Sequence, residues 1–553
     1  MFDYIVVGGG SAGCVLAGRL SEDPAVRVCL LEAGPADHSV LIHCPAGLAV
    51  MAKYMLNGWG LNTTPQPGLG GRRGYQPRGK VLGGSSSINA MIYVRGQPQD
   101  YDHWAAQGNP GWGWSDVLPY FLRAENNERG ADAWHATGGP LNVMDLRSPN
   151  RFARVFVEAG VQAGHAHNRD FNGATQEGVG EYQVTHRNGE RFSAAKAYLT
   201  PHLARPNLQV LTRAHATRVL FDGRRAVGVE FRQGNRLQQL RCKREVLLSA
   251  GALLSPQLLM LSGIGPGAQL QRHGITVLHD QPGVGAHLHD HPDVVRVVDA
   301  PGQSELFGIS VPGVARIVRG VKEWRNQRSG MLTTNFAEAG GFIRSQPSET
   351  APDVQLHFVI GKLVDHGRKT VLGHGHSCHV CLLQPVSRGS VQLASGDPMA
   401  LPLVDPNFLG ERADMDRMVH GFRRMQEILA QPALARYGAP EILESDTEIE
   451  AFIRQHADTI YHPVGTCRMG PGAMDVVDER LRVRGVERLR VVDASIMPSI
   501  VGGKLILISL KAPSSPWMPR ASFMKQPAQH SARKFLPVRR LPVGRSSCAA
   551  GSI

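Results

Sequence analysis

The sequence has no long apolar run, few cysteines and no strong excess of one charge over most of its length. No run approaches the roughly 20 residues of a membrane-spanning helix, so we expect no such span. Eight cysteines among 553 residues are too few for a disulfide scaffold. No basic segment precedes the first apolar run, so we expect no signal peptide and a reducing, cytoplasmic location.

The net charge of +13 is concentrated at the C-terminal end. Residues 504–553 hold nine Lys or Arg and no Asp or Glu, which leaves +4 for the preceding 503 residues. No recognisable nucleic-acid-binding module accompanies these cations, so we expect no nucleic-acid partner. The segment also holds six prolines and shows no sustained helical period, which predicts a disordered tail.

The rest of the composition is typical of a globular enzyme. Hydrophobic residues make up 42% of the chain and charged residues 19%, which excludes a largely disordered protein. A chain of 553 residues is long enough for two or more domains.

A glycine-rich turn follows the first apolar run. Residues 4–7 are apolar and rich in β-branched side chains, as in a strand buried on both faces. Gly8, Gly10 and Gly13 then form G-x-G-x-x-G, followed by a helical stretch at 14–20. In this motif the first glycine makes a tight turn, the second lets a pyrophosphate approach the backbone, and the third lets helix and strand pack closely. The helix N-terminus supplies N–H groups for phosphate.

A second apolar run, at 26–31, ends in Glu32. An acidic residue at this spacing accepts hydrogen bonds from ribose hydroxyls. The order of strand, glycines, helix, strand and acid therefore predicts dinucleotide binding, without distinguishing NAD from FAD.

Three further motifs follow along the chain. Their positions are Arg78–Asn89 (RGKVLGGSSSIN), a small-residue turn and apolar helix from Gly251 to Gly265, and Tyr461–Gly470 (YHPVGTCRMG) followed by Arg490–Pro498 (RVVDASIMP). With the first glycine motif, they resemble in sequence and order the glucose–methanol–choline oxidoreductases, which are FAD-dependent enzymes that oxidise alcohols. The resemblance covers residues 1–503 and is strongest to bacterial alcohol, polyethylene glycol and sorbose dehydrogenases, with choline dehydrogenases somewhat further off.

The resemblance implies an α/β fold with an α+β second domain. A Rossmann-like FAD-binding domain is expected from residues 1–150, 187–298 and 458–503. A substrate domain built on an antiparallel sheet is expected from residues 151–186 and 299–457.

The resemblance also implies which residues bind FAD. The expected set is Gly8, Gly10, Ser11, Ala12, Gly13, Glu32, Ala33, Gly83, Gly84, Ser85, Asn89, Ala216, Asp493 and Ala494. Some family members attach FAD to a histidine, and the matching residue here is Ile88. Because Ile88 has no nucleophile, we expect FAD to be held non-covalently.

His462 is the candidate catalytic base. An alcohol becomes a good hydride donor when a base takes its hydroxyl proton, and histidine titrates in the appropriate range. The alternative is a structural histidine in a turn restrained by Pro463. The surrounding motif and the family resemblance favour catalysis.

Two other groups of residues suggest metal or redox sites. His287, His289 and His291 alternate, which would place them on one side of an extended strand. Cys378 and Cys381 have the spacing of half a zinc or redox site, without a second cysteine pair. We expect neither group to hold a metal, and we expect the cysteines to be buried in a strand.

The sequence departs from the family after Gly503. Family members have an Asn or His three residues beyond these glycines, where this chain has Ile506. Loss of such a hydrogen-bond donor typically costs about 100- to 1000-fold in rate. Two explanations compete for residues 504–553: a genuine basic extension that contacts an anionic membrane surface, or a reading-frame change near codon 504.

These observations predict an FAD-dependent dehydrogenase that converts a primary alcohol to an aldehyde and passes electrons to a quinone or redox carrier rather than NAD. The alternatives are a flavin-binding homologue with impaired catalysis, an oxidase, a lyase that uses the same histidine, and a membrane or nucleic-acid adaptor.

Overall fold

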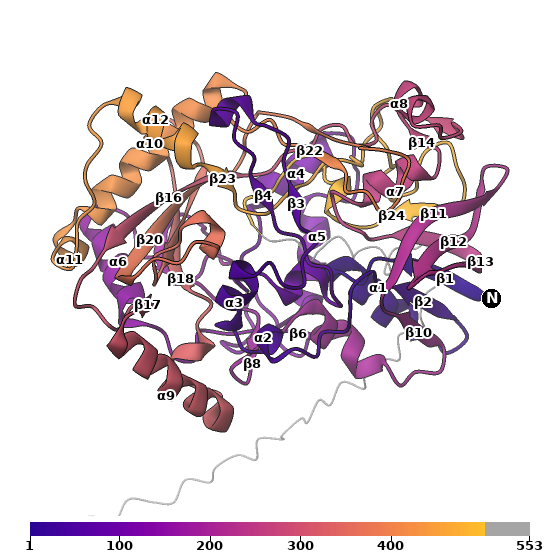
Figure 1. The fold of residues 1–553 in the computed structure, drawn as a ribbon. Coiled ribbons are helices and arrows are strands. Elements are labelled where there is room, and N and C mark those ends of the chain that lie inside the picture. Colours follow the sequence, from indigo (N-terminus) through magenta and orange to yellow (C-terminus); the bar gives the residue numbers. More distant parts are fainter. Residues whose placement is uncertain (504–553) are drawn as a thin grey trace, which may run out of the picture.

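The computed structural model describes residues 1–503 and contains two large sheets (Figure 1). The first sheet lies at the right of the view, near the N-terminus, and the second at the left. The predictions made for residues 504–553, namely a disordered tail and the role of position 506, lie outside the described residues. None of the helices within residues 1–503 has the length and apolarity of a membrane span.

The first sheet is built around β1 (Phe2–Val7). This strand is parallel to β2 (Val28–Leu31) on one side and to β13 (Arg236–Leu248) on the other. The sheet has seven strands in the order β10-β2-β1-β13-β12-β11, with β24 also paired to β13. The other strands are β10 (Leu208–Leu211), β11 (Ala214–Asp222), β12 (Arg225–Gln233) and β24 (Leu489–Val491). The strand expected at 4–7 is confirmed.

Strand β13 pairs in antiparallel orientation along its first half and in parallel orientation along its second half. Its residues 236–241 form an antiparallel ladder with β12, and its residues from 242 onward run parallel to β1. Its last three residues also pair in parallel with β24. The parallel part of the sheet is therefore assembled from three distant stretches of chain.

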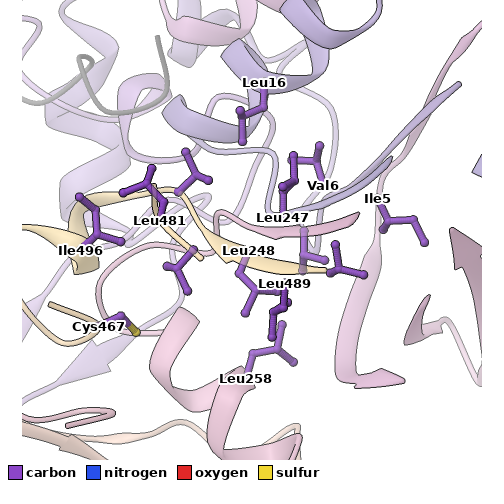
Figure 2. Packing of buried hydrophobic residues seen from close by; sticks show 14 of the residues in the cluster. Ile5, Val6, Leu16, Leu247, Leu248, Leu258, Cys467, Leu481, Leu489 and Ile496 are labelled. Atoms are coloured by element: carbon purple, nitrogen blue, oxygen red, sulfur yellow. The ribbon is translucent and has the colours of Figure 1, made fainter. Parts of the chain in front are cut away.

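The core of this region combines the same distant stretches (Figure 2). Ile5 and Val6 of β1 pack with Leu247 and Leu248 of β13, and Leu489 of β24 joins them. All five side chains are buried. Helix α1 (Ser11–Leu20) is also mostly buried, as expected for a helix that is apolar on nearly all sides.

The second sheet is antiparallel throughout. Its order is β23-β16-β20-β19-β18-β7, with β17 also paired to β20. The strands are β7 (Gly178–Glu181), β16 (Pro292–Asp299), β17 (Gly308–Ile309), β18 (Ala337–Ile343), β19 (Val354–Val359), β20 (Gly373–Leu382) and β23 (Asp458–Thr459). The chain first enters this sheet with β7 and returns to it at Pro292, ahead of the domain boundary expected at 298.

Helices pack against both sheets. Helices α6 and α10 share an apolar cluster with β18, β19 and β20. The helices are α2 (Val40–His43), α3 (Gly47–Lys53), α4 (Pro98–Ala106), α5 (Trp114–Ala124), α6 (Arg151–Gln162), α7 (Ser255–Leu261), α8 (Gly267–Arg272), α9 (Val311–Gln327), α10 (Arg412–Leu429), α11 (Pro432–Ala435) and α12 (Asp446–His456).

Short paired strands complete the described structure. They are β3 (Leu61–Asn62), β4 (Tyr75–Gln76), β5 (Glu125–Asn127), β6 (Leu141–Val143), β8 (His186–Arg187), β9 (Glu190–Arg191), β14 (Ile264–Gly265), β15 (His279–Asp280), β21 (Ser390–Gln392) and β22 (Leu403–Asp405).

Candidate active site

A cavity of about 740 Å³ is bordered by both sheets. The first sheet contributes the ends of β1, β2 and β13, and the second contributes residues of β18, β19 and β20. The cavity is lined by Gly8, Gly10, Ser11, Ala12, Glu32, Ala33, Gly84, Ser85, Asn89, Ala216, His462, Asp493 and Ala494. Of the residues expected to bind the cofactor, only Gly13 and Gly83 are outside the lining.

The three glycines of the first motif have different surroundings. Gly8 has φ +102°, and a Cβ there would lie 2.5 Å from the Ser249 carbonyl oxygen. A Cβ on Gly13 would lie 1.8 Å from the Gly8 carbonyl oxygen, so Gly13 closes the turn against the helix. A Cβ on Gly10 would have Ser249 as its nearest neighbour, at 4.0 Å. Gly10 therefore leaves open space at the start of α1, where backbone N–H groups suit an anionic ligand.

Glu32 fixes the shape of this turn. Its Oε2 accepts a hydrogen bond from the Gly9 N–H at 2.8 Å, and its Oε1 accepts one from the Gly34 N–H at 2.7 Å. Burial raises the pKa of Glu32 to about 7. Each carboxylate oxygen has a further lone pair, so Glu32 retains capacity to accept hydrogen bonds from a ligand.

The second glycine turn contacts the first. The Gly83 N–H donates to the Gly9 carbonyl at 2.7 Å, and a Cβ on Gly84 would lie 2.7 Å from the Gly10 Cα. Gly83 thus has a structural contact behind the cavity wall. Asn89 is held by its Oδ1, which accepts from Met91 N–H and from Arg191 Nη1.

Asp493 joins the end of β24 to the turn after β13. Its Oδ2 accepts from the Gly251 N–H at 2.9 Å and from Ser255 Oγ at 2.5 Å. Its Oδ1 accepts from the Ser495 N–H and hydroxyl. Burial raises the pKa of Asp493. The carboxylate therefore orders two segments that both border the cavity.

The loop that carries His462 is anchored by Asp290. The Asp290 Oδ1 accepts from the His462 N–H at 2.7 Å and from the His291 N–H at 2.9 Å. Its Oδ2 accepts from the Thr459 hydroxyl. Burial raises the pKa of Asp290 to about 6. The His462 ring lies edge-on to the ring of His291, with 5.6 Å between their centroids.

A second network holds the residue before His462. Tyr461 has φ +78°, and its hydroxyl hydrogen-bonds to His366 Nδ1. His366 Nε2 lies 2.8 Å from Asp458 Oδ2. These contacts among Asp458, His366 and Tyr461 tie the loop that carries His462 to the loop between β19 and β20. The sequence offers no signal for this contact, because the three residues belong to no shared local motif.

Arg78 borders the cavity, with part of its guanidinium buried behind the wall. Its side chain is inaccessible at Nε and Nη2, and neither nitrogen has a hydrogen-bond partner within residues 1–503. Burial lowers its pKa. Buried donors without a partner are rare in folded proteins, so Arg78 is an exception in the cavity wall.

The wall from the second sheet is apolar with a few polar groups. His379 Nδ1 lies 2.7 Å from Asp293 Oδ2, and both residues are buried. The His357 ring lies edge-on to His379, at 5.8 Å between centroids. Both histidines line the cavity with the apolar residues Ala337 and Val359. This side of the cavity was not assigned residues from the sequence, because its strands carry no recognisable motif.

The two groups considered for metal binding are a set of histidines and a pair of cysteines. The prediction that His287, His289 and His291 share one extended strand is wrong at His287, because its φ is +59°. Cys378 and Cys381 are buried in β20, as predicted. Within residues 1–503, no group of three His, Cys, Asp or Glu side chains could hold a metal ion.

Comparison with known proteins gives consistent matches. The family model for GMC oxidoreductase matches residues 2–293 and 385–510. The chain is 48% identical over 511 residues to "Alcohol dehydrogenase [acceptor]" of Pseudomonas putida, covering 91% of this chain and 92% of that protein. It is 42% identical over 511 residues to an oxygen-dependent choline dehydrogenase of Brucella anthropi, with the same coverage.

Solved structures show the same fold. Pyridoxine 4-oxidase from Mesorbium loti has a TM-score of 0.83 and 31% identity, covering 93% of this chain and 98% of that one. An FAD-dependent oxidoreductase from Chaetomium thermophilum has a TM-score of 0.83 and 26% identity, covering 93% and 97%.

Proposed function

The chain belongs to the GMC oxidoreductase family and is an FAD-dependent oxidoreductase, and on that premise we propose that it oxidises a primary alcohol to an aldehyde with His462 as the base. The observation that carries this proposal is one continuous cavity lined by the glycine turn, Glu32 and His462. An acceptor other than NAD takes the electrons, in keeping with the relatives named above.

The glycine turns and the start of α1 hold FAD in this proposal. Gly10 and the first N–H groups of α1 face the pyrophosphate, and Glu32 accepts from the ribose hydroxyls. Ile88 lines the cavity at the position where a covalent attachment would require a nucleophile. FAD is therefore held non-covalently.

His462 performs the proton step. A ring nitrogen of His462 takes the hydroxyl proton of the alcohol, which leaves the oxygen electrons to form the carbonyl as the carbinol carbon loses its hydride. When bound, FAD supplies the hydride acceptor at flavin N5. Asp290 and Tyr461 hold the backbone around His462, so they act as positioning residues.

The wall formed by β18, β19 and β20 receives the alcohol. Its apolar side chains exclude water and suit a hydrocarbon chain, and the Asp293–His379 pair supplies a polar group. We further propose a quinone or redox carrier as acceptor. A reducing cytoplasmic location is supported by the seven cysteines within residues 1–503, all free thiols. We keep a membrane contact through residues 504–553 as a separate proposal, supported by their charge alone.

The experiment is flavin reduction by a medium-chain primary alcohol without oxygen. We expect the yellow holoenzyme to bleach, and His462→Ala to retain FAD while the bleaching rate falls by about 100- to 10,000-fold. His103→Ala, an exposed histidine on α4, is the control and should bleach at the parent rate. Equal bleaching of His462→Ala would overturn the role of His462. A yellow parent enzyme that no alcohol bleaches would favour the impaired homologue.

A further inference from the structure

Helix α9 lies on the outside of the molecule (Figure 1), and four of its valines are exposed. The spacing of three, four and three residues places its four valines on one side of the helix. Their exposed fractions are 87% for Val311, 51% for Val314, 66% for Val318 and 42% for Val321. A different side of the helix is buried through Gly313, Gly320 and Trp324. The stripe is therefore not the face that packs against the protein.

Basic side chains accompany this stripe. Arg319, Lys322 and Arg325 are exposed on the same helix, and Glu323 is its only acidic residue. A helix with one apolar side and flanking cations lies well in the interface of a lipid bilayer. There its apolar side chains enter the acyl boundary, and its cations approach anionic headgroups.

The stripe continues to the edge of the cavity. Ile309 of β17, directly before α9, is exposed and bridges to exposed Leu372. Across the cavity edge, Met55 and Leu56 are also exposed. Ile309, Met55 and Leu56 line the cavity themselves. The α9 surface consists of the four exposed valines of α9 together with Ile309, Leu372, Met55 and Leu56.

A hydrogen bond joins the two sides of the cavity edge. Lys53 Nζ at the end of α3 donates to Thr370 Oγ1 at 2.6 Å, and both residues line the cavity. The α9 surface therefore borders the entrance to the same cavity that holds His462. Several exposed apolar residues gathered around a cavity entrance are typical of an interaction surface.

We propose that the α9 surface docks the enzyme on a bilayer that contains anionic lipids. The cations of α9 favour an anionic partner. They disfavour a second copy of this chain placed face to face, because like charges would meet. They equally disfavour residues 504–553 as the covering segment, because those residues carry nine cations and no acid. Docking turns the cavity entrance toward the lipid, so apolar molecules dissolved in the membrane reach it directly. This last consequence rests on the proposed function.

The test is flotation of the full-length holoenzyme with vesicles of phosphatidylcholine containing about 30 mol% phosphatidylglycerol. The variant is Val314→Glu with Val318→Glu, which places two carboxylates in the α9 surface. The matched control is Val161→Glu, an exposed valine on α6. We expect the parent and the control to float with the vesicles. The fraction of the double variant that floats should be about tenfold lower than that of the parent. High salt should lower the fraction of the parent that floats.

Three results would overturn the proposal. The first is a parent enzyme that does not float. The second is a double variant that floats as well as the parent, since binding would then not use α9. The third is a change in oligomeric state of the double variant in sedimentation without vesicles, which would assign the surface to a second copy. Dye-coupled alcohol oxidation in vesicle-free buffer should be unchanged in the double variant. That assay reports failure of the proposed function separately.

Discussion

At the residue scale, Asp290 shows how a buried carboxylate positions a loop at the expense of stability. It accepts hydrogen bonds from Thr459, His291 and His462. Burial nevertheless outweighs these bonds and raises its pKa from 3.8 to about 6. The native protein therefore keeps a proton on Asp290 at pH values where the unfolded chain has lost it.

Removing this carboxylate should change how stability depends on pH. Because the folded pKa is the higher one, the contribution of Asp290 is fully present below pH 3.8 and is lost as pH rises through about 6. A shift of this size corresponds to about 3 kcal/mol. In the parent, the free energy of unfolding should therefore fall between pH 4 and 7. We expect most of this fall to be absent in Asp290→Asn, as measured by urea denaturation. Asp222→Asn, at an exposed position, should keep the parent slope, and a parent-like slope in Asp290→Asn would contradict the assignment.

The hydrogen bonds around Tyr461 could not be predicted from the sequence. His462 was predicted because it stands within a contiguous motif, and Pro463 follows it. Asp290 and His366 lie far from it in sequence and contact its loop only through the fold. A single sequence records no such pairing, so the groups that hold the base in place required the three-dimensional structure.

At the element scale, the unit of β1, glycine turn and α1 was predictable because its contacts are local. Apolar spacing gives the strand, and the three glycines give a turn in which each has a separate task. The observed surroundings distinguish these tasks. Gly10 faces open space, whereas Gly13 is in contact with the Gly8 carbonyl. The long β13 and its three partners were not predictable in this way, because their pairing depends on distant strands.

Substituting Gly10 and Gly13 should therefore affect different properties, FAD binding for Gly10 and folding stability for Gly13. Gly10 has φ −75°, which any residue adopts, so Gly10→Val should fold and lose FAD because its side chain fills the space for the pyrophosphate. Gly13→Val should lose stability by more than about 3 kcal/mol, because its Cβ would overlap the Gly8 carbonyl. Circular dichroism and bound-flavin absorbance separate the outcomes. A colourless, unfolded Gly10→Val would show that the space is not free.

At the scale of the whole molecule, the cavity borders both sheets, so a ligand that fills it contacts both. Binding to the native state alone raises stability by mass action. At about 1,000 times its Kd, FAD adds about 4 kcal/mol. We expect the apoprotein to unfold several degrees below the holoenzyme in differential scanning calorimetry, and to regain the difference when FAD is restored. Gly10→Val should show no such response, and an equal rise in that variant would locate the stabilising FAD elsewhere.

The position of β24 has a consequence for synthesis on the ribosome. This strand completes the parallel part of the first sheet beside β13, yet roughly 240 residues separate the two in the chain. At typical translation rates, the nascent chain waits about 10 to 50 s between them. During that interval the edge of β13 lacks its final neighbour, and an unpaired strand edge invites association with other chains. The nascent polypeptide therefore has a defined window in which a chaperone would protect it.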